Sequence, residues 1–212
     1  MAALPIEEII PLVWAILGVL AALSVLAATL VLVKLVQFRR ARLGDGRSAA
    51  QALQQWRAGE RDTALSTAAA AAGPRAALLH EIFAVLAAHP GDTARAQARG
   101  TQRAIEDLAA LDRNMRGIEA VVQSAPMLGL LGTVVGMIEA FGRLAQSTGV
   151  ADPAELAGGI WTALITTALG LAIAIVFYFL SLWLEARITR ERAALESLLA
   201  AVPGPDAAPG SG

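Results

Sequence analysis

The 212-residue chain contains no cysteine, which excludes disulfides, iron–sulfur clusters and thiol chemistry. It has two histidines, His80 and His89, and we expect both to be ordinary surface or helix-end residues rather than metal ligands. Residues 40–117 contain no glycine-rich phosphate loop, no paired catalytic carboxylates and no Ser/His/Asp set. These absences predict a protein that is not an enzyme, holds no metal or cofactor and has no nucleic-acid partner.

Charge is also scarce, and it is segregated. Only 17% of the residues are charged, and the mean hydropathy is +0.58. The sequence has three long runs without formal charge, of 25, 19 and 29 residues: 9–33, 120–138 and 156–184. Because a bilayer core needs about 20 apolar residues of helix, we predict an all-α membrane protein with three transmembrane helices, a helical cytoplasmic domain and long helices extending into the cytoplasm. The spans are expected near 11–36, 119–145 and 156–184.

The first span has an alternative interpretation as a cleavable signal peptide. A signal peptide begins with basic residues and has a short apolar core. This chain begins instead with Glu7 and Glu8, and its apolar run is longer. These features favour a transmembrane helix.

Lysine and arginine predict the orientation, because they are enriched in cytoplasmic loops. Thirteen of the 17 lie between Lys34 and Arg116, and three more follow the third span. We therefore expect residues 1–10 outside (periplasmic), 40–117 inside, and 185–212 as a cytoplasmic tail that is disordered from 203. Trp161 and Trp183 are expected to anchor the two ends of span three.

Glycine and proline divide the cytoplasmic segment into helices near 47–57, 60–72 and 75–88. A longer helix is predicted to begin with Asp92 or Thr93 as its cap. We expect it to continue into span two without a break.

Span two carries a stripe of small residues on one helical face. Glycine buries little surface and lowers helix stability, so such a face is useful only where another helix packs close to the backbone. Thr133 lies on the edge of this face. The stripe consists of Ala125, Gly129, Gly132, Gly136 and Ala140.

Span three has a similar face and more threonines. Its small face is expected to contain Ala163, Thr167, Gly170, Ala174 and Ser181, with Thr162 and Thr166 on an adjacent face. The two small faces could pack closely or line a narrow lumen, with Thr133, Thr162, Thr166 and Thr167 as ion-pathway candidates. The alternative is that each threonine hydroxyl bonds only to a carbonyl of its own helix.

No ionisable side chain lies in the central part of any span. A proton relay normally needs one, and a threonine hydroxyl does not titrate near neutral pH. If ions cross here, another subunit must therefore supply a carboxylate. Glu139, Glu155 and Glu185 lie at the membrane borders, where we expect anchors, although Glu155 could also stand at an ion entrance.

The segment 125–141, APMLGLLGTVVGMIEAF, resembles the second-helix signature of the MotA/TolQ/ExbB proton-channel family. The segment 158–175, GGIWTALITTALGLAIAI, resembles the third-helix signature of its ExbB/TolQ branch. Pro126 and Gly132 match the second-helix signature, and by motif position Thr133 and Thr167 match the pore-facing threonines of the family. The topology is also similar, so the resemblance covers essentially the whole chain.

The resemblance implies a bacterial inner-membrane protein that forms a homo-oligomer, a pentamer, around a smaller partner. That partner would be an ExbD/TolR-like single-span protein bringing a membrane aspartate. The complex would be a stator-type motor that couples proton flow to energised uptake (the ExbB-like role) or to envelope integrity (the TolQ-like role). Sodium is an alternative ion. A MotA role is disfavoured, because that branch normally has four spans.

Two positions depart from the family pattern. Thr162 occupies the glutamate position of GI-x-E-AL, and Val176 occupies the proline position of A-I-P. The first change removes a carboxylate often assigned to ion passage, and the second favours a straighter helix. The sequence therefore leaves open a passive oligomeric membrane scaffold that does not conduct ions. A membrane-anchored enzyme has little support.

Overall fold

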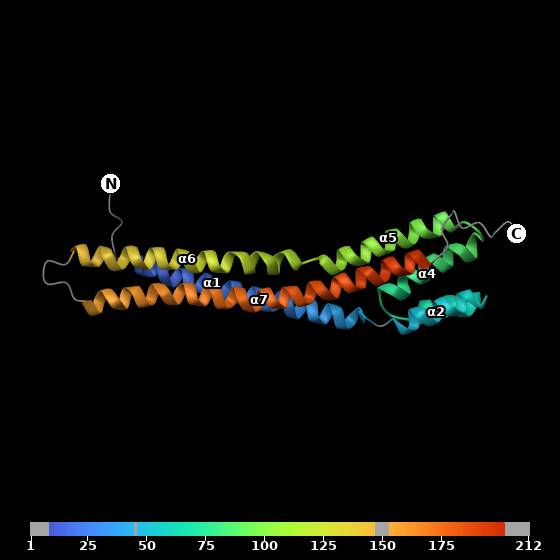
Figure 1. The fold of residues 1–212 in the computed structure, drawn as a ribbon, viewed down its shortest axis with the longest axis horizontal. Coiled ribbons are helices and arrows are strands. Elements are labelled where there is room, and N and C mark those ends of the chain that lie inside the picture. Colours follow the sequence, from blue (N-terminus) through green and yellow to red (C-terminus); the bar gives the residue numbers. More distant parts are fainter. Residues whose placement is uncertain (1–8, 45, 147–152, 202–212) are drawn as a thin grey trace. The chain divides into compact units, whose positions relative to one another are not determined.

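The structure is a computed structural model, and it describes residues 9–44, 46–146 and 153–201. The expected periplasmic start, part of the loop after span two and the tail from 202 lie outside the described residues. Within the described ranges all regular elements are α-helices (Figure 1). They are α1 (Ile9–Arg40), α2 (Arg47–Arg57), α3 (Arg61–Ala70), α4 (Pro74–Ala88), α5 (Thr93–Asp112), α6 (Met115–Gln146) and α7 (Pro153–Ala201).

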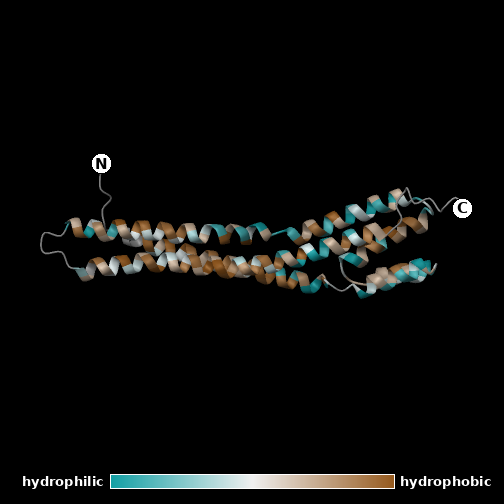
Figure 2. Ribbon diagram, viewed as in Figure 1, coloured by the Kyte–Doolittle hydropathy of each residue, from teal (hydrophilic) through white to brown (hydrophobic). Residues whose placement is uncertain are grey.

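Three helical stretches of the described chain are long and apolar enough to cross a membrane. Hydrophobic residues are abundant along α1, α6 and the first part of α7 (Figure 2). The prediction of an all-α membrane protein with three transmembrane helices is therefore confirmed. The stretches are Leu12–Arg40, Thr93–Gln146 and Leu156–Ala201.

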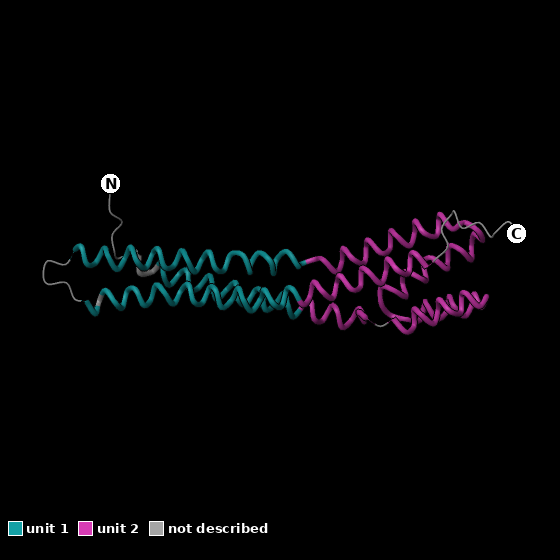
Figure 3. The backbone as a smooth tube through the Cα atoms, in the orientation of Figure 1, with its two compact units in different colours: residues 1–32, 114–182 teal, residues 33–113, 183–212 magenta. Residues whose placement is uncertain are grey.

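The chain divides into two compact units (Figure 3). Unit 1 comprises residues 1–32 and 114–182, and unit 2 comprises residues 33–113 and 183–212. Unit 1 therefore contains most of α1, all of α6 and the first thirty residues of α7. The second contains α2 to α5 with the ends of α1 and α7.

Unit 1 buries its small residues and a few larger apolar side chains, and leaves many of its large apolar residues exposed. Val13, Ile16 and Leu20 of α1 form a buried cluster with Ala125, Val135 and Ala174. By contrast Trp14 and Met127 are each 70% exposed. An exposed apolar surface of this kind is costly in water but suits lipid or neighbouring protein in a membrane.

Unit 2 has a conventional apolar core built largely from alanine and from one face of α4. Leu78, Leu79, Ile82 and Phe83 of α4 are fully buried, and the Phe83 ring stacks on Trp56 with centroids 4.3 Å apart. Leu195 brings the end of α7 into this core.

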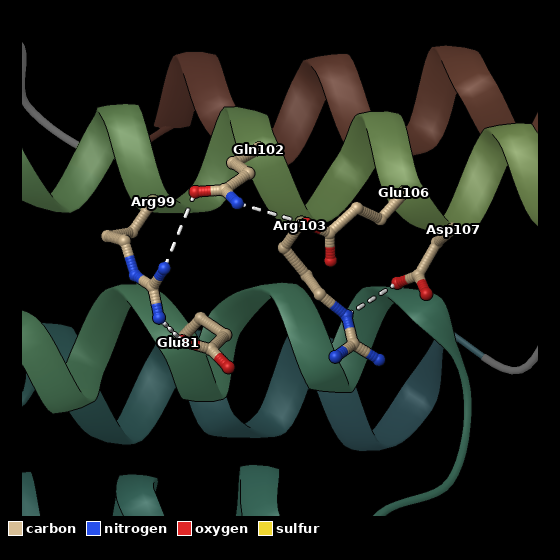
Figure 4. A network of polar contacts seen from close by, with 6 residues as sticks. All are labelled: Glu81, Arg99, Gln102, Arg103, Glu106 and Asp107. Carbon is tan, nitrogen blue, oxygen red and sulfur yellow. Dashed lines mark hydrogen bonds and ion pairs between the residues drawn. The ribbon is translucent and has the colours of Figure 1, made fainter.

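Ion pairs add to the core of unit 2. The Arg75 guanidinium donates to both carboxylate oxygens of the nearly buried Glu191, at 3.0 and 2.8 Å. This bidentate geometry compensates the buried charge. Arg99, Arg103 and their neighbours form a more exposed network over α4 and α5 (Figure 4), and such surface pairs stabilise little.

The expected cytoplasmic helices correspond to α2, α3 and α4. The predicted cap of the next helix is Asp92, whose carboxylate accepts a hydrogen bond from the Arg95 amide at 3.0 Å. The expectation of one unbroken helix into span two is wrong, however. α5 ends at Asp112, Arg113 is extended (ψ 136°), Asn114 is left-handed (φ 69°), and α6 begins at Met115.

The break between α5 and α6 has a physical cause in α1. A helix end leaves its last carbonyls without intrahelical donors. The side-chain amide of Gln37 donates to the Ala110 carbonyl at 2.9 Å, and the buried Lys34 ammonium donates to the Leu111 carbonyl. Asparagine tolerates the left-handed conformation better than most residues, so Asn114 completes the turn.

Candidate functional site

The small face of α6 is buried in the structure. Ala125, Gly129, Gly132, Gly136 and Ala140 are all buried, at the helical spacing that the sequence predicts. Pro126 stands beside them inside α6, where it removes one backbone donor without ending the helix.

The partner of this face is α7 of the same chain, and the two backbones are very close. A Cβ added at Gly170 would lie 2.5 Å from the Ala125 carbonyl oxygen and 3.1 Å from the Gly129 Cα. A Cβ at Gly136 would lie 2.8 Å from the Ala163 Cβ. We call this contact the α6–α7 seam. It consists of the five small residues of α6 with Gly159, Ala163, Thr166, Thr167, Gly170 and Ala174 of α7.

One part of the expected α7 face is wrong. Thr166, expected on an adjacent face, is fully buried, whereas Thr167 is only partly buried. Gly159 also belongs to the seam, since a Cβ there would lie 2.7 Å from the Ala140 Cβ. The spacing 159, 163, 166, 170, 174 is the better helical stripe, and the sequence already contained it.

Two threonines of α7 join the helices across the seam. The Thr167 hydroxyl donates to the Gly129 carbonyl at 2.7 Å. The Thr166 hydroxyl lies 3.2 Å from the same carbonyl and 2.7 Å from the Ala163 carbonyl of its own helix. Only glycine at 129 and 132 leaves room for these contacts, because a Cβ at Gly132 would overlap Thr166.

The other two threonines bond within their own helices. The Thr133 hydroxyl donates to the Leu130 carbonyl at 2.7 Å, and the Thr162 hydroxyl donates to the Gly158 carbonyl at 3.0 Å. Both groups lie at the accessible surface of the chain. The alternative of purely intrahelical bonding thus describes Thr133 and Thr162 and fails for Thr167, while the Thr166 hydroxyl has an acceptor on each helix.

All four hydroxyls share one chemical property. Each has a backbone carbonyl to which its single proton can be donated. A hydroxyl that donates in this way keeps only its oxygen lone pairs for another group. The threonines at accessible positions can therefore accept a hydrogen bond or coordinate a cation, but they do not readily donate.

Titratable groups lie only at the borders of this region. Glu139 pairs with Arg143 one turn further along α6, which agrees with an anchoring role. The side chain of Glu155 is outside the described residues. The described residues contain no group of three His, Cys, Asp or Glu side chains placed to hold a metal ion.

Two residues of α1 have structural roles that the sequence did not predict. Lys34 and Gln37 cap α5 from a helix 73 to 77 residues away, and local spacing contains no signal for such a contact. A lysine at the end of an apolar run is more often interpreted as solvated, although Lys34 is 0% exposed.

The chain is similar to several known proteins. The relative in Methanothermobacter thermautotrophicus, named as an ExbB homolog, is 41% identical over 87 residues, which are 41% of this chain and 30% of that protein. The biopolymer transport protein exbB1 of Vibrio cholerae is 48% identical over 65 residues, which are 29% and 28% of the two chains. The biopolymer transport protein ExbB of Helicobacter pylori is 38% identical over 77 residues, which are 34% and 52%.

The matched part thus spans less than a third of the first two relatives. The sequence profile of the MotA/TolQ/ExbB proton channel family matches residues 61–197, which include α3, α4, α5, α6 and nearly all of α7. The match therefore contains the complete α6–α7 seam. With its three apolar helices and this family match, the chain is a multi-pass membrane protein that belongs to the MotA/TolQ/ExbB proton channel family.

Proposed function

We propose that this chain is a stator-type subunit of the bacterial inner membrane, part of a motor that couples the proton-motive force to work on the outer envelope. Membership of the family and the biopolymer transport names of the relatives support this proposal. The observation that carries it is a close-packed seam with hydroxyls on and beside it, in a region whose own sequence has no titratable side chain.

The hydrogen bonds support a partner that brings a titratable carboxyl group. The threonine protons have backbone acceptors, so the lone pairs of the hydroxyl oxygens can accept a hydrogen bond from water or from a protonated carboxyl group. A membrane aspartate from an ExbD/TolR-like single-span protein is such a donor when protonated, and it supplies the missing titratable group. Sodium is the alternative ion, since the same oxygens can ligate it. The ring would contain several copies of this chain, with five as the proposed number.

The decisive experiment measures ion flux in vesicles. The chain is purified together with the partner encoded by the neighbouring gene and reconstituted into vesicles. A potassium diffusion potential drives proton flux, and a dye reports the pH of the vesicle lumen. Thr133→Val and Thr167→Val should each lower the proton flux about five- to tenfold, since each deletes one hydrogen-bonding group worth about 1 kcal/mol. Repeating the measurement without sodium separates the two ions.

Thr29→Val is the matched control. Thr29 lies on α1, and its exposed hydroxyl donates to the Val25 carbonyl at 2.8 Å, so the same chemical change occurs away from the seam. The control should conduct normally. If Thr133→Val and Thr167→Val also conduct normally, the threonines are structural and the proposed pathway is wrong.

A passive scaffold is the second candidate, and two observations favour it. Thr162 replaces a carboxylate of the family pattern, and Thr133 and Thr162 bond back to their own helices. A scaffold would assemble with its partner but show no flux above empty vesicles. Flux that depends on Thr133 or Thr167 would reject it.

The orientation can be tested directly, because the chain has no cysteine of its own. Single cysteines are introduced as Ala2→Cys and as Thr63→Cys on exposed α3. A membrane-impermeant maleimide added to intact spheroplasts should label the first variant and not the second. The reverse pattern would overturn the proposed topology.

A further inference from the structure

Unit 2 contains an open cavity of about 480 Å³ between the end of α1 and the last third of α7. Three arginines line it: Arg39, Arg42 and Arg187. The rest of the lining is apolar and aromatic, from Leu35, Phe38, Leu43 and Trp183. Nothing in the function proposed above uses this cavity.

The three arginines have no carboxylate partner among the described residues. Across the described residues, none of their guanidinium groups donates to a carboxylate. The Arg187 guanidinium instead lies over the Trp183 ring, 4.9 Å from its centroid. Glu185 is a solvent-exposed neighbour on α7, and Asp45 lies outside the described residues. Among the described residues, the cavity therefore presents positive charge with no carboxylate bonded to it.

The backbone at Arg42 points to a specific role for that side chain. α1 ends in a Schellman turn, in which the Leu43 amide donates to the Phe38 carbonyl and the Arg42 amide to the Arg39 carbonyl, at 3.3 and 3.2 Å. Arg42 occupies the left-handed position of this turn with φ 44°. Glycine normally takes that position, because a side chain there is strained. The chain keeps an arginine where glycine would be more stable.

The position of the cavity identifies the ligand. Its α1 side belongs to the last turn of an apolar helix that ends at Arg40, where headgroups meet a bilayer. Guanidinium groups bind phosphate oxygens in pairs, tryptophan favours the membrane interface, and a basic cluster next to a span attracts anionic lipid. We propose that this cavity binds the phosphate headgroup of an anionic phospholipid, with Arg39, Arg42 and Arg187 as ligands and Leu35 and Phe38 against its acyl chains.

The test uses the full-length protein extracted in mild detergent, with short-chain phosphatidylglycerol as the probe. Bound lipid is counted by native mass spectrometry, with phosphatidylcholine and inorganic phosphate as parallel arms. Arg39→Gln, Arg42→Gln and Arg187→Gln should each weaken phosphatidylglycerol binding about fivefold, the effect of one basic residue near a lipid surface. Arg40→Gln is the matched control, because Arg40 is an exposed neighbour that does not line the cavity.

Arg42→Gly adds a readout that distinguishes a binding site from general surface charge. It should raise the melting temperature of the lipid-free protein, because it relieves the left-handed strain, and it should still weaken lipid binding. Equal losses in Arg40→Gln and the cavity variants would overturn the proposal. So would equal binding of phosphatidylcholine, or full competition by millimolar inorganic phosphate, which would indicate a free-phosphate site.

Discussion

The close approach at Gly170 predicts that the smallest possible side chain is harmful there. Gly170→Ala adds one methyl group whose nearest neighbours are the Ala125 carbonyl oxygen at 2.5 Å and the Gly129 Cα at 3.1 Å. Both are backbone atoms of α6, so no side-chain rotation can relieve the overlap. The two helices must separate by a substantial fraction of an ångström.

The expected cost can be estimated from three contributions. Overpacking a tight interface costs about 1–3 kcal/mol. Separation also lengthens the bonds from Thr166 and Thr167 to the Gly129 carbonyl, and an interhelical hydrogen bond in a membrane is worth about 0.6 kcal/mol. Alanine gains about 1 kcal/mol of helix propensity over glycine. The net effect is a destabilisation of about 1–3 kcal/mol.

Gly158→Ala and Gly18→Ala are the matched controls. A Cβ at either position meets nothing within 4 Å, so only the gain in helix propensity remains, up to about 1 kcal/mol. Thermal unfolding of the purified protein, followed by tryptophan fluorescence, measures the difference. At roughly 2–4 °C per kcal/mol for a chain of this size, Gly170→Ala should melt about 5–10 °C below the controls.

One result would refute the reasoning. If Gly170→Ala melts at or above both controls, then α6 and α7 are not in backbone contact at this point. The seam, and every role assigned to it, would then be wrong. A loss in Gly158→Ala alone would instead indicate that its open surface meets another subunit.

Four further predictions follow from named contacts. Gly132→Leu should abolish assembly as judged by size-exclusion chromatography, because a side chain there overlaps Thr166; a normal oligomer peak would contradict the seam. Thr167→Val should lower the unfolding free energy by about 0.6 kcal/mol. Thr162→Val loses only an intrahelical bond and should leave the unfolding free energy nearly unchanged. Equal effects of the two substitutions would argue against the bond across the seam. Asn114→Gly should be tolerated, because Asn114 has a left-handed backbone conformation. Asn114→Val should lower the free energy of unfolding by about 1–2 kcal/mol. A fully stable valine variant would show that α5 and α6 form one helix. Lys34→Met should speed amide hydrogen exchange at the end of α5, because the Leu111 carbonyl loses its donor, and should leave exchange in α4 unchanged. If exchange is unchanged in both helices, Lys34 does not cap α5.

The small stripe of α6 was predictable because its information is local. Ala125, Gly129 and Gly136 recur at three- and four-residue steps, and the helical period alone places them on one face. The cap at Asp92 is likewise a property of a few neighbouring residues. Thr167 does contact α6, but the placement of Thr166 on an adjacent face was wrong. Adjacent residues stand about 100° apart on a helix, so whether one or both enter the seam depends on how α6 crosses α7.

The sequence by itself determined the fold class, the three apolar spans and the small face of α6, because hydropathy and helical period are properties of short segments. Only the tertiary structure decided that Asn114 breaks the helix, that Thr166 and Thr167 share the Gly129 carbonyl, and that Lys34 is buried. Each of these depends on the partner that a carbonyl finds 37 to 77 residues away. Helix packing determines which donor reaches such a carbonyl, and a local sequence pattern contains no information on that packing.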